Sequence, residues 1–156
     1  MSAAAIQERL QSLGVTLPTP AAPVANYVPF VISGKTLYVS GQLPVGLDGQ
    51  MVKGQLGRDA TLEQGQQAAR LCAINILAQA NAALGGDLSR IARCVKLGGF
   101  VASTSDFFDH PKVINSASDL IVGALGDAGR HARFAVGVAA LPFGAAVEVD
   151  AIFELT

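Results

Sequence analysis

The chain has 156 residues and a mass of 16.0 kDa, the size of one ordinary domain with a full hydrophobic core. Hydrophobic types make up 51% and charged types only 15%, which excludes a disordered chain, and the net charge of −1 argues against a surface that gathers nucleic acid or anionic lipid. No apolar run approaches the roughly 18 to 20 residues that cross a bilayer, and charges stand where a signal peptide would be apolar. We expect a cytoplasmic protein that binds neither membranes nor nucleic acid.

Side chains that commonly bind metals are scarce. Cys72 and Cys94, the only cysteines, stand in no CxxC motif and near no histidine at ligand spacing, which indicates two buried thiols. His110 and His131 lie far apart, outside any HxH or HExxH pattern. The stretches ALGGD and GALGDAG match neither the P-loop nor the dinucleotide fingerprint. We predict no metal and no other cofactor.

The first 25 residues are predicted to form an extension before a main domain of residues 26–156. Apolar residues at spacings of four and three, with a glycine beyond, predict a short amphipathic helix: Ile6, Leu10, Leu13 and Gly14. Three prolines then predict an extended linker: Pro18, Pro20 and Pro23.

The main domain shows alternating strand and helix patterns. Strands are predicted over 26–32, 36–40, 93–101, 131–140 and 146–155. Helices are predicted over 61–84, ended by Gly85-Gly86, and from Pro111 to Leu125. The order β-β-α-β-α-β-β predicts an α/β sandwich with one mixed sheet.

Right-handed crossovers place both predicted helices on the same face of that sheet and leave the other face bare. A chain with so few ionic side chains needs a cover for such a face. We therefore expect a homo-oligomer.

Alternation along the last two strands predicts which side chains face outward. In the last strand the apolar set Val147, Val149, Ala151 and Phe153 points to the core, so Glu148 points out. In the strand before it, the apolar set Phe134, Val136 and Val138 is predicted to face the core. Its neighbours are then expected on the outward face with Glu148: Arg133, Ala135 and Gly137.

Arg133 is the leading candidate for chemistry. It is a lone guanidinium beside the small residues Ala135 and Gly137, which leave room for a ligand, and its two parallel N–H donors match a planar carboxylate. A small acid would fit there. The alternative is an ordinary surface or interface salt bridge.

Glu148 is the second candidate. If the turn over 141–144 joins neighbouring strands, Glu148 lies roughly opposite Gly137, about 13 Å from Arg133 at about 3.3 Å per residue. That gap suits a small molecule and a water, with Arg133 holding charge and Glu148 transferring protons. The alternative is a solvated carboxylate. Two histidines do not assemble a Ser-His-Asp or Cys-His site, so covalent catalysis is not favoured.

Two blocks of sequence resemble the RidA/YjgF family of reactive intermediate deaminases, also labelled endoribonuclease L-PSP. The likeness runs from about Asn26 to Leu155. The first block is Tyr27…Tyr38-Val39-Ser40-Gly41-Gln42-Leu43-Pro44. The second is Ala132-Arg133-Phe134-Ala135-Val136…Leu141-Pro142…Val147-Glu148-Val149-Asp150-Ala151-Ile152.

The resemblance implies a chorismate-mutase-like fold assembled as a homotrimer, with ligand clefts between subunits. It implies cofactor-independent hydrolysis of 2-aminoacrylate and related enamines or imines to 2-oxo acids and ammonia. Arg133 matches the arginine that clamps the substrate carboxylate, and Glu148 the glutamate that orients water. Further positions match residues that line the cleft, Tyr27 and Asn115 reaching it from the neighbouring chain: Tyr27, Ser40, Gly41, Asn115 and Ala135.

The sequence departs from the family pattern around the clamp. Ala135 stands where a cysteine is usual, and His131 where proline is frequent. These changes suggest a divergent subgroup and leave the substrate open, deamination of aromatic catabolites included. Two other functions are considered: a non-catalytic module that binds 2-oxo acids, and an endoribonuclease, which the low charge and the absence of tryptophan disfavour.

Overall fold

A single mixed sheet of five strands forms the centre of the molecule in the computed structural model, which describes residues 1–20 and 25–156. The strand order is β1-β2-β5-β3-β4, and only β3 and β4 run parallel. The strands are β1 Phe30–Ser33, β2 Thr36–Gln42, β3 Ile91–Ala102, β4 Ala132–Val138 and β5 Val147–Leu155. Pro23 of the expected linker lies outside the described residues.

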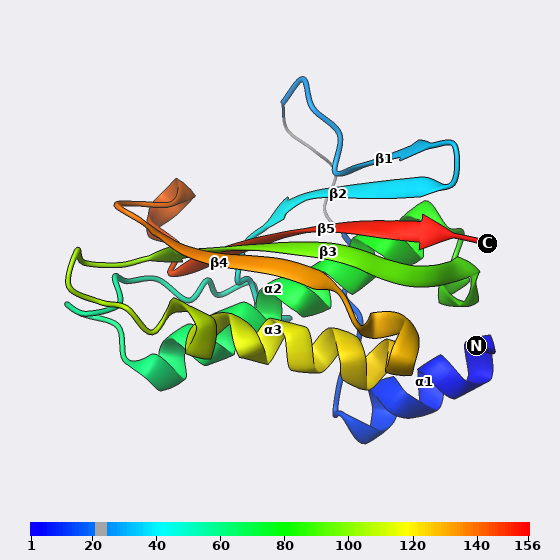
Figure 1. Ribbon diagram of the computed structural model, residues 1–156, viewed down its shortest axis with the longest axis horizontal. Coiled ribbons are helices and arrows are strands. Elements are labelled where there is room, and N and C mark those ends of the chain that lie inside the picture. Colours follow the sequence, from blue (N-terminus) through cyan, green and yellow to red (C-terminus); the bar gives the residue numbers. More distant parts are fainter. Residues whose placement is uncertain (21–24) are drawn as a thin grey trace.

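Two long helices cover one face of the sheet. They are α2 Leu62–Ala83 and α3 His110–Leu125, which pack side by side, with α1 Ala3–Ser12 beside α3 (Figure 1). Short 3-10 turns are η1 Leu88–Arg90, η2 Gly126–Gly129 and η3 Pro142–Gly144. The predicted α/β sandwich is confirmed. Among the described residues, none of the helices is long and apolar enough to span a membrane.

The ends of the long helices follow from local sequence. Thr61 caps α2 through a reciprocal capping box with Gln64, and the helix ends before Gly85, whose φ is +66°. Pro111 occupies the first turn of α3, where its missing N–H removes no helical bond.

The N-terminal helix α1 packs into the same core as the rest of the chain. Ile6 and Leu10 are buried in it, together with Val15 beyond the helix. Arg70 of α2 donates a hydrogen bond of 2.7 Å to the carbonyl oxygen of Leu13. These contacts tie the end of α1 to α2.

The expected pairing of the last two strands is wrong, because β3 lies between β4 and β5. The parallel β3–β4 pair needs the crossover through α3, and β5 then inserts antiparallel between β2 and β3. Glu148 is therefore paired with Phe100 of β3 and not with Gly137. The predicted separation from Arg133 along neighbouring strands loses its basis.

The predicted alternation is confirmed for β5, whose odd-numbered residues are buried, but is wrong for β4. Register with β3 puts Arg133, beside the buried Leu97, on the helix-covered face. Phe134 faces the open side, where its ring meets Phe100 edge to face at 5.2 Å, and Lys96 Nζ lies 5.3 Å from its centroid. Hydrophobicity gave the wrong face because the open face carries apolar side chains as well as charged ones. Its exposed members include Val31, Tyr38 and Val136.

Candidate functional site

The predicted site residues fall into two groups within one chain. Arg133 and Ala135 lie on β4, with Asn115 on the adjacent α3. The other group spans the opposite edge and the centre of the sheet: Tyr27, Ser40, Gly41 and Glu148. The expectation that Arg133 and Glu148 share one outward face is wrong, since Arg133 faces the helices and Glu148 the open side.

The Arg133 guanidinium is held by neutral acceptors. Its Nη1 donates to Asn115 Oδ1 at 2.9 Å and to Ser118 Oγ at 3.1 Å, two side chains one turn apart on α3. Asn115 thus reaches Arg133 from the same chain, and the expectation that it would come from the neighbouring chain is wrong. None of the ion pairs among residues 1–20 and 25–156 involves Arg133. A guanidinium has five N–H donors, so donors beyond Nη1 remain for an anion.

Beside Arg133 lie Ser118, which the sequence analysis missed, and His131, which it noted as a departure from the family pattern without giving it a role in the site. Ser118 Oγ lies 2.9 Å from His131 Nε2, and His131 Nδ1 lies 2.6 Å from the carbonyl oxygen of Gly129. The only sequence signal was the spacing of Ser118 three residues after Asn115, which places both on one side of a helix.

The second histidine, His110, is the first residue of α3 and lies against the same face of β4, beside Gly137. His110 Nε2 is 3.0 Å from Ser103 Oγ, and a side chain at Gly137 would collide with both. A larger residue at Gly137 would have to displace these two side-chain ends. No cluster of three or more potential metal ligands occurs in the described part of the chain.

Gly41 and Glu148 meet on the open face. A Cβ atom at Gly41 would lie 2.9 Å from Glu148 Cδ, closer than real side chains allow, so glycine makes room for this carboxylate. A β-bulge between Val39 and Gln42 brings Gly41 to this position. Ser40 Oγ donates a hydrogen bond of 2.9 Å to the carbonyl oxygen of Val28, which ties β2 to the segment before β1.

The environment of Glu148 favours its protonated form. Partial burial, and then the neighbouring Asp150 carboxylate, raise the pKa of Glu148 above its usual range. Burial also raises the pKa of Asp150, opposed by the Gly98 backbone N–H and by Lys96. A carboxyl that keeps its proton more readily than usual is better suited to giving and taking protons.

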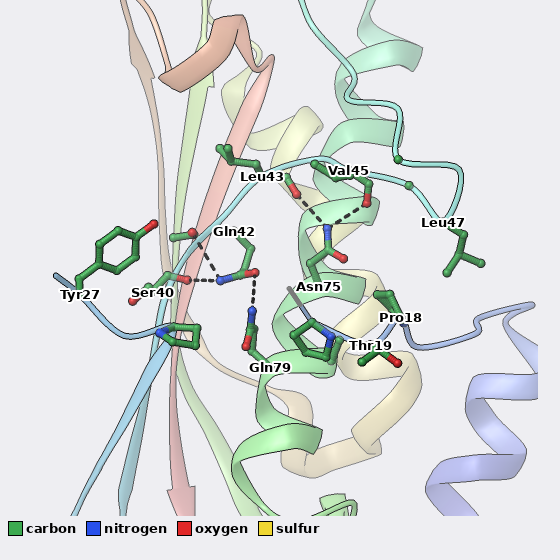
Figure 2. A pocket seen from close by; sticks show the side chains of 16 residues that line it. Pro18, Thr19, Tyr27, Ser40, Gln42, Leu43, Val45, Leu47, Asn75 and Gln79 are labelled. Atoms are coloured by element: carbon green, nitrogen blue, oxygen red, sulfur yellow. Dashed lines mark hydrogen bonds between the residues drawn. The ribbon is translucent and has the colours of Figure 1, made fainter. Parts of the chain in front are cut away.

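A cavity of about 550 Å³ adjoins the Ser40 end of β2, with Tyr27 at its rim (Figure 2). Gln42 Nε2 donates 3.0 Å to the Ser40 carbonyl, and Asn75 Nδ2 donates to the carbonyls of Leu43 and Val45. None of the described residues that line the cavity carries a charge.

Gln79 of α2 lines the same cavity, and its Oε1 is buried without a hydrogen-bond partner among the described residues. Its Nε2 makes only a long 3.5 Å bond to Gln42 Oε1. Asn75 and Gln79 stand four residues apart on α2 and so lie on one side of the helix, a spacing that could have indicated this region from the sequence.

The two thiols are buried, as predicted. Burial raises the pKa of Cys72 well above its usual value, and Cys72 Sγ lies 3.6 Å from the Val147 carbonyl. Burial likewise raises the pKa of Cys94 to about 12. Neither thiol is poised to act as a nucleophile.

Comparison with known proteins places these features in context. The family model "YjgF/chorismate mutase-like, putative endoribonuclease" matches residues 7–155. Protein TCP17 of Trypanosoma cruzi is 54% identical over 151 residues, 96% of this chain and 94% of that protein.

Solved structures are similar over nearly the whole chain. Atu1372 of Agrobacterium tumefaciens, described as having unknown function, is 56% identical with a TM-score of 0.92, covering 99% of this chain and 96% of that one. A "putative endoribonuclease" of Shewanella oneidensis is 38% identical with a TM-score of 0.90, covering 96% and 99%. Both alignments include the N-terminal helix α1, at least in large part.

Proposed function

Since the chain belongs to the YjgF/RidA family, we propose that it hydrolyses reactive enamines and imines, 2-aminoacrylate and related 2-imino acids, to 2-oxo acids and ammonia. The observation that carries the proposal is the state of Arg133. Its charge is held by an amide and a hydroxyl and is matched by no carboxylate among the described residues. Such a guanidinium favours an incoming carboxylate, the group that all these substrates share.

The site is completed between copies of the chain. Arg133 lies on the edge strand β4, while Ser40 and Gly41 lie near the opposite edge. When unlike edges of neighbouring copies meet, the contact is head to tail, and it forms a ring where the rotation between copies closes. We propose a homotrimer in which Arg133, Asn115 and Ala135 of one copy face the group of Tyr27, Ser40, Gly41 and Glu148 of the next. The exposed apolar side chains of the open face, Val31, Tyr38 and Val136 among them, are what such an assembly would cover.

The chemistry asked of the protein is modest. The substrate reacts as an iminium ion, which an enamine such as 2-aminoacrylate reaches by taking a proton from solvent at its methylene carbon. Water adds to the iminium carbon and gives its surplus proton to the Glu148 carboxylate, which leaves a neutral carbinolamine. Glu148 returns that proton to the nitrogen; as the C–N bond breaks, the hydroxyl proton passes to Glu148 and then to the departing ammonia, so the products are a 2-oxo acid and ammonium. Arg133 fixes the carboxylate so that the imine carbon meets the water in one orientation. Glu148, whose pKa is raised, accepts the proton when water adds and donates it when the nitrogen leaves. These residues need no further group for this reaction.

The first experiment is a coupled assay in which a dehydratase generates 2-aminoacrylate and pyruvate release is followed. We expect the wild-type protein to accelerate release and Arg133→Ala to abolish the acceleration. Equal rates with and without the protein would rule out the proposed activity. Binding of 2-oxo acids without turnover would instead favour the non-catalytic binding module.

The shared site is tested by mixing two inactive variants. Arg133→Ala and Glu148→Gln subunits, unfolded together and refolded, should regain about a quarter of the wild-type activity, since one arrangement in four pairs an intact Arg133 with an intact Glu148. The same variants mixed without refolding are the control. No recovery, together with a monomeric mass in sedimentation, would contradict the shared site.

The endoribonuclease label of relatives is an alternative that the charge disfavours, since the chain carries 11 basic and 12 acidic residues. RNA cleavage that co-purifies with the wild-type protein and disappears in Arg133→Ala would reverse this preference.

A further inference from the structure

We infer that Ser118 and His131 form a hydrogen-bonded relay that sets the orientation of the Arg133 guanidinium, and that both are positioning residues for carboxylate binding. The inference rests on the proposed function only in taking Arg133 as the anion clamp. Its basis is a chain of hydrogen bonds that runs from a backbone carbonyl to the guanidinium.

The direction of this chain follows from its end at Gly129. A carbonyl oxygen can only accept, so His131 Nδ1, 2.6 Å away, carries a hydrogen and donates it. In the neutral imidazole, Nε2 is then an acceptor. Gly129 is buried at the end of η2, which holds this acceptor in place.

The hydroxyl of Ser118 links the ring to the guanidinium. Its single hydrogen is donated to His131 Nε2 over 2.9 Å. Its oxygen lone pair is thereby turned toward Arg133 Nη1, which donates over 3.1 Å. Without His131 the hydroxyl could rotate and offer its hydrogen instead of its lone pair to the arginine.

Asn115 Oδ1 accepts the other hydrogen of Nη1 at 2.9 Å, so both hydrogens of this nitrogen are used. The rest of the guanidinium keeps its N–H groups for a ligand. Two fixed acceptors on one nitrogen define the plane of the group, and that plane determines where a bidentate carboxylate can lie. The relay therefore acts on ligand binding through Arg133, without touching the ligand.

The test is calorimetric binding of pyruvate to the full-length protein. Ser118→Ala and His131→Ala should each weaken binding about 3- to 10-fold, the range for loss of one orienting hydrogen bond. The double variant should be no weaker than Ser118→Ala, because His131 acts only through that hydroxyl. Ser118→Thr and His131→Gln, which keep the required groups, should retain most of the affinity. Ser116→Ala, on the same helix and in none of these bonds, is the matched control and should bind as the wild type does.

A second measurement needs no ligand. With ¹⁵N-labelled arginine, the Nη hydrogens of Arg133, assigned by their loss in Arg133→Ala, should give separate NMR signals in the wild type and averaged signals in Ser118→Ala and His131→Ala. Circular dichroism and melting temperature establish that each variant folds.

Unchanged arginine signals and unchanged affinity in a folded His131→Ala protein would overturn the relay, as would additive losses in the double variant. If the wild type neither binds pyruvate nor accelerates imine hydrolysis, the proposed function fails. The NMR comparison alone then decides the relay.

Discussion

The two groups of candidate residues are held in opposite ways. Around Arg133, a positive charge is surrounded by neutral acceptors that are satisfied by hydrogen bonds of 2.6 to 3.1 Å. Around Glu148, a carboxylate lies beside a second carboxylate, against a glycine that leaves it just enough room. The first group is suited to holding a ligand charge in one place, and the second to exchanging protons. Under the proposed function, binding therefore belongs to the β4 edge and proton transfer to the centre of the open face.

The sharpest way to break this division is to remove the charge from the β4 edge. Arg133→Ala should lower kcat/KM for acidic imines about 100- to 1,000-fold, since a bidentate charge-assisted pair contributes about 3–4 kcal/mol. Arg133→Lys keeps the positive charge but lacks the two parallel N–H donors, so its kcat/KM should lie between those of the wild type and Arg133→Ala. Steady-state kinetics measures this. A lysine variant as active as the wild type would show that charge alone suffices and that the orientation of the guanidinium does not matter.

A smaller effect is expected from crowding Glu148. Gly41→Ala places a methyl group where the Glu148 carboxyl now lies and should lower kcat about 10-fold with little change in KM, because the carboxylate moves while the clamp does not. The control is the same change in a Glu148→Ala background, where it should cost nothing further. Equal losses in both backgrounds would mean that Gly41 acts through the backbone and not through Glu148.

Local sequence predicted the elements well and their arrangement less well. The helix predicted over 61–84 and the alternation of β5 are set by neighbouring residues, so their prediction succeeded. The insertion of β5 between β2 and β3 depends on contacts far apart in sequence, which no local pattern records. The face of Arg133 was mispredicted because β4 has apolar residues toward the open side, a surface suited to a partner.

The candidate site was predictable only where residue type itself carries chemistry. Arg133 and Glu148 could be singled out on that basis. Ser118 could not, because its contact with Arg133 depends on the rotation of α3 relative to β4. The proposed relay through His131 also depends on η2, because the Gly129 carbonyl at the end of η2 holds the imidazole ring.

The raised pKa of Glu148 should also affect how the stability of the protein depends on pH. Because the pKa of Glu148 is raised above its ordinary 4.5, the folded protein binds this proton more tightly than the unfolded chain does. Stability therefore falls as pH rises from about 4.5 through the folded-state pKa, and this loss persists above it. Glu148→Gln removes that loss, so its melting temperature relative to wild type should be higher at pH 7 than at pH 4. Asp150→Asn should show the same sign.

Thermal unfolding across this pH range decides the point. Parallel curves for wild type and Glu148→Gln would show that partial burial does not destabilise the charged form. The open face would then be better solvated around Glu148 than its position beside Asp150 indicates.

The smallest expected effect concerns the uncharged cavity lined by Ser40 and Gly41, which adjoins Glu148. Gln79 Oε1 is buried without a partner among the described residues, and an unsatisfied buried acceptor costs about 1–3 kcal/mol. Gln79→Met, close in shape and without that oxygen, should raise the free energy of unfolding by about 1 kcal/mol in denaturant titration. Gln67→Met, exposed on the same helix, should change it by less than about 0.5 kcal/mol. Destabilisation by Gln79→Met would mean that the oxygen does have a partner, a water or ligand held in the cavity. The cavity beside Glu148 would then be a binding site of its own, and ligand binding would no longer be confined to the β4 edge.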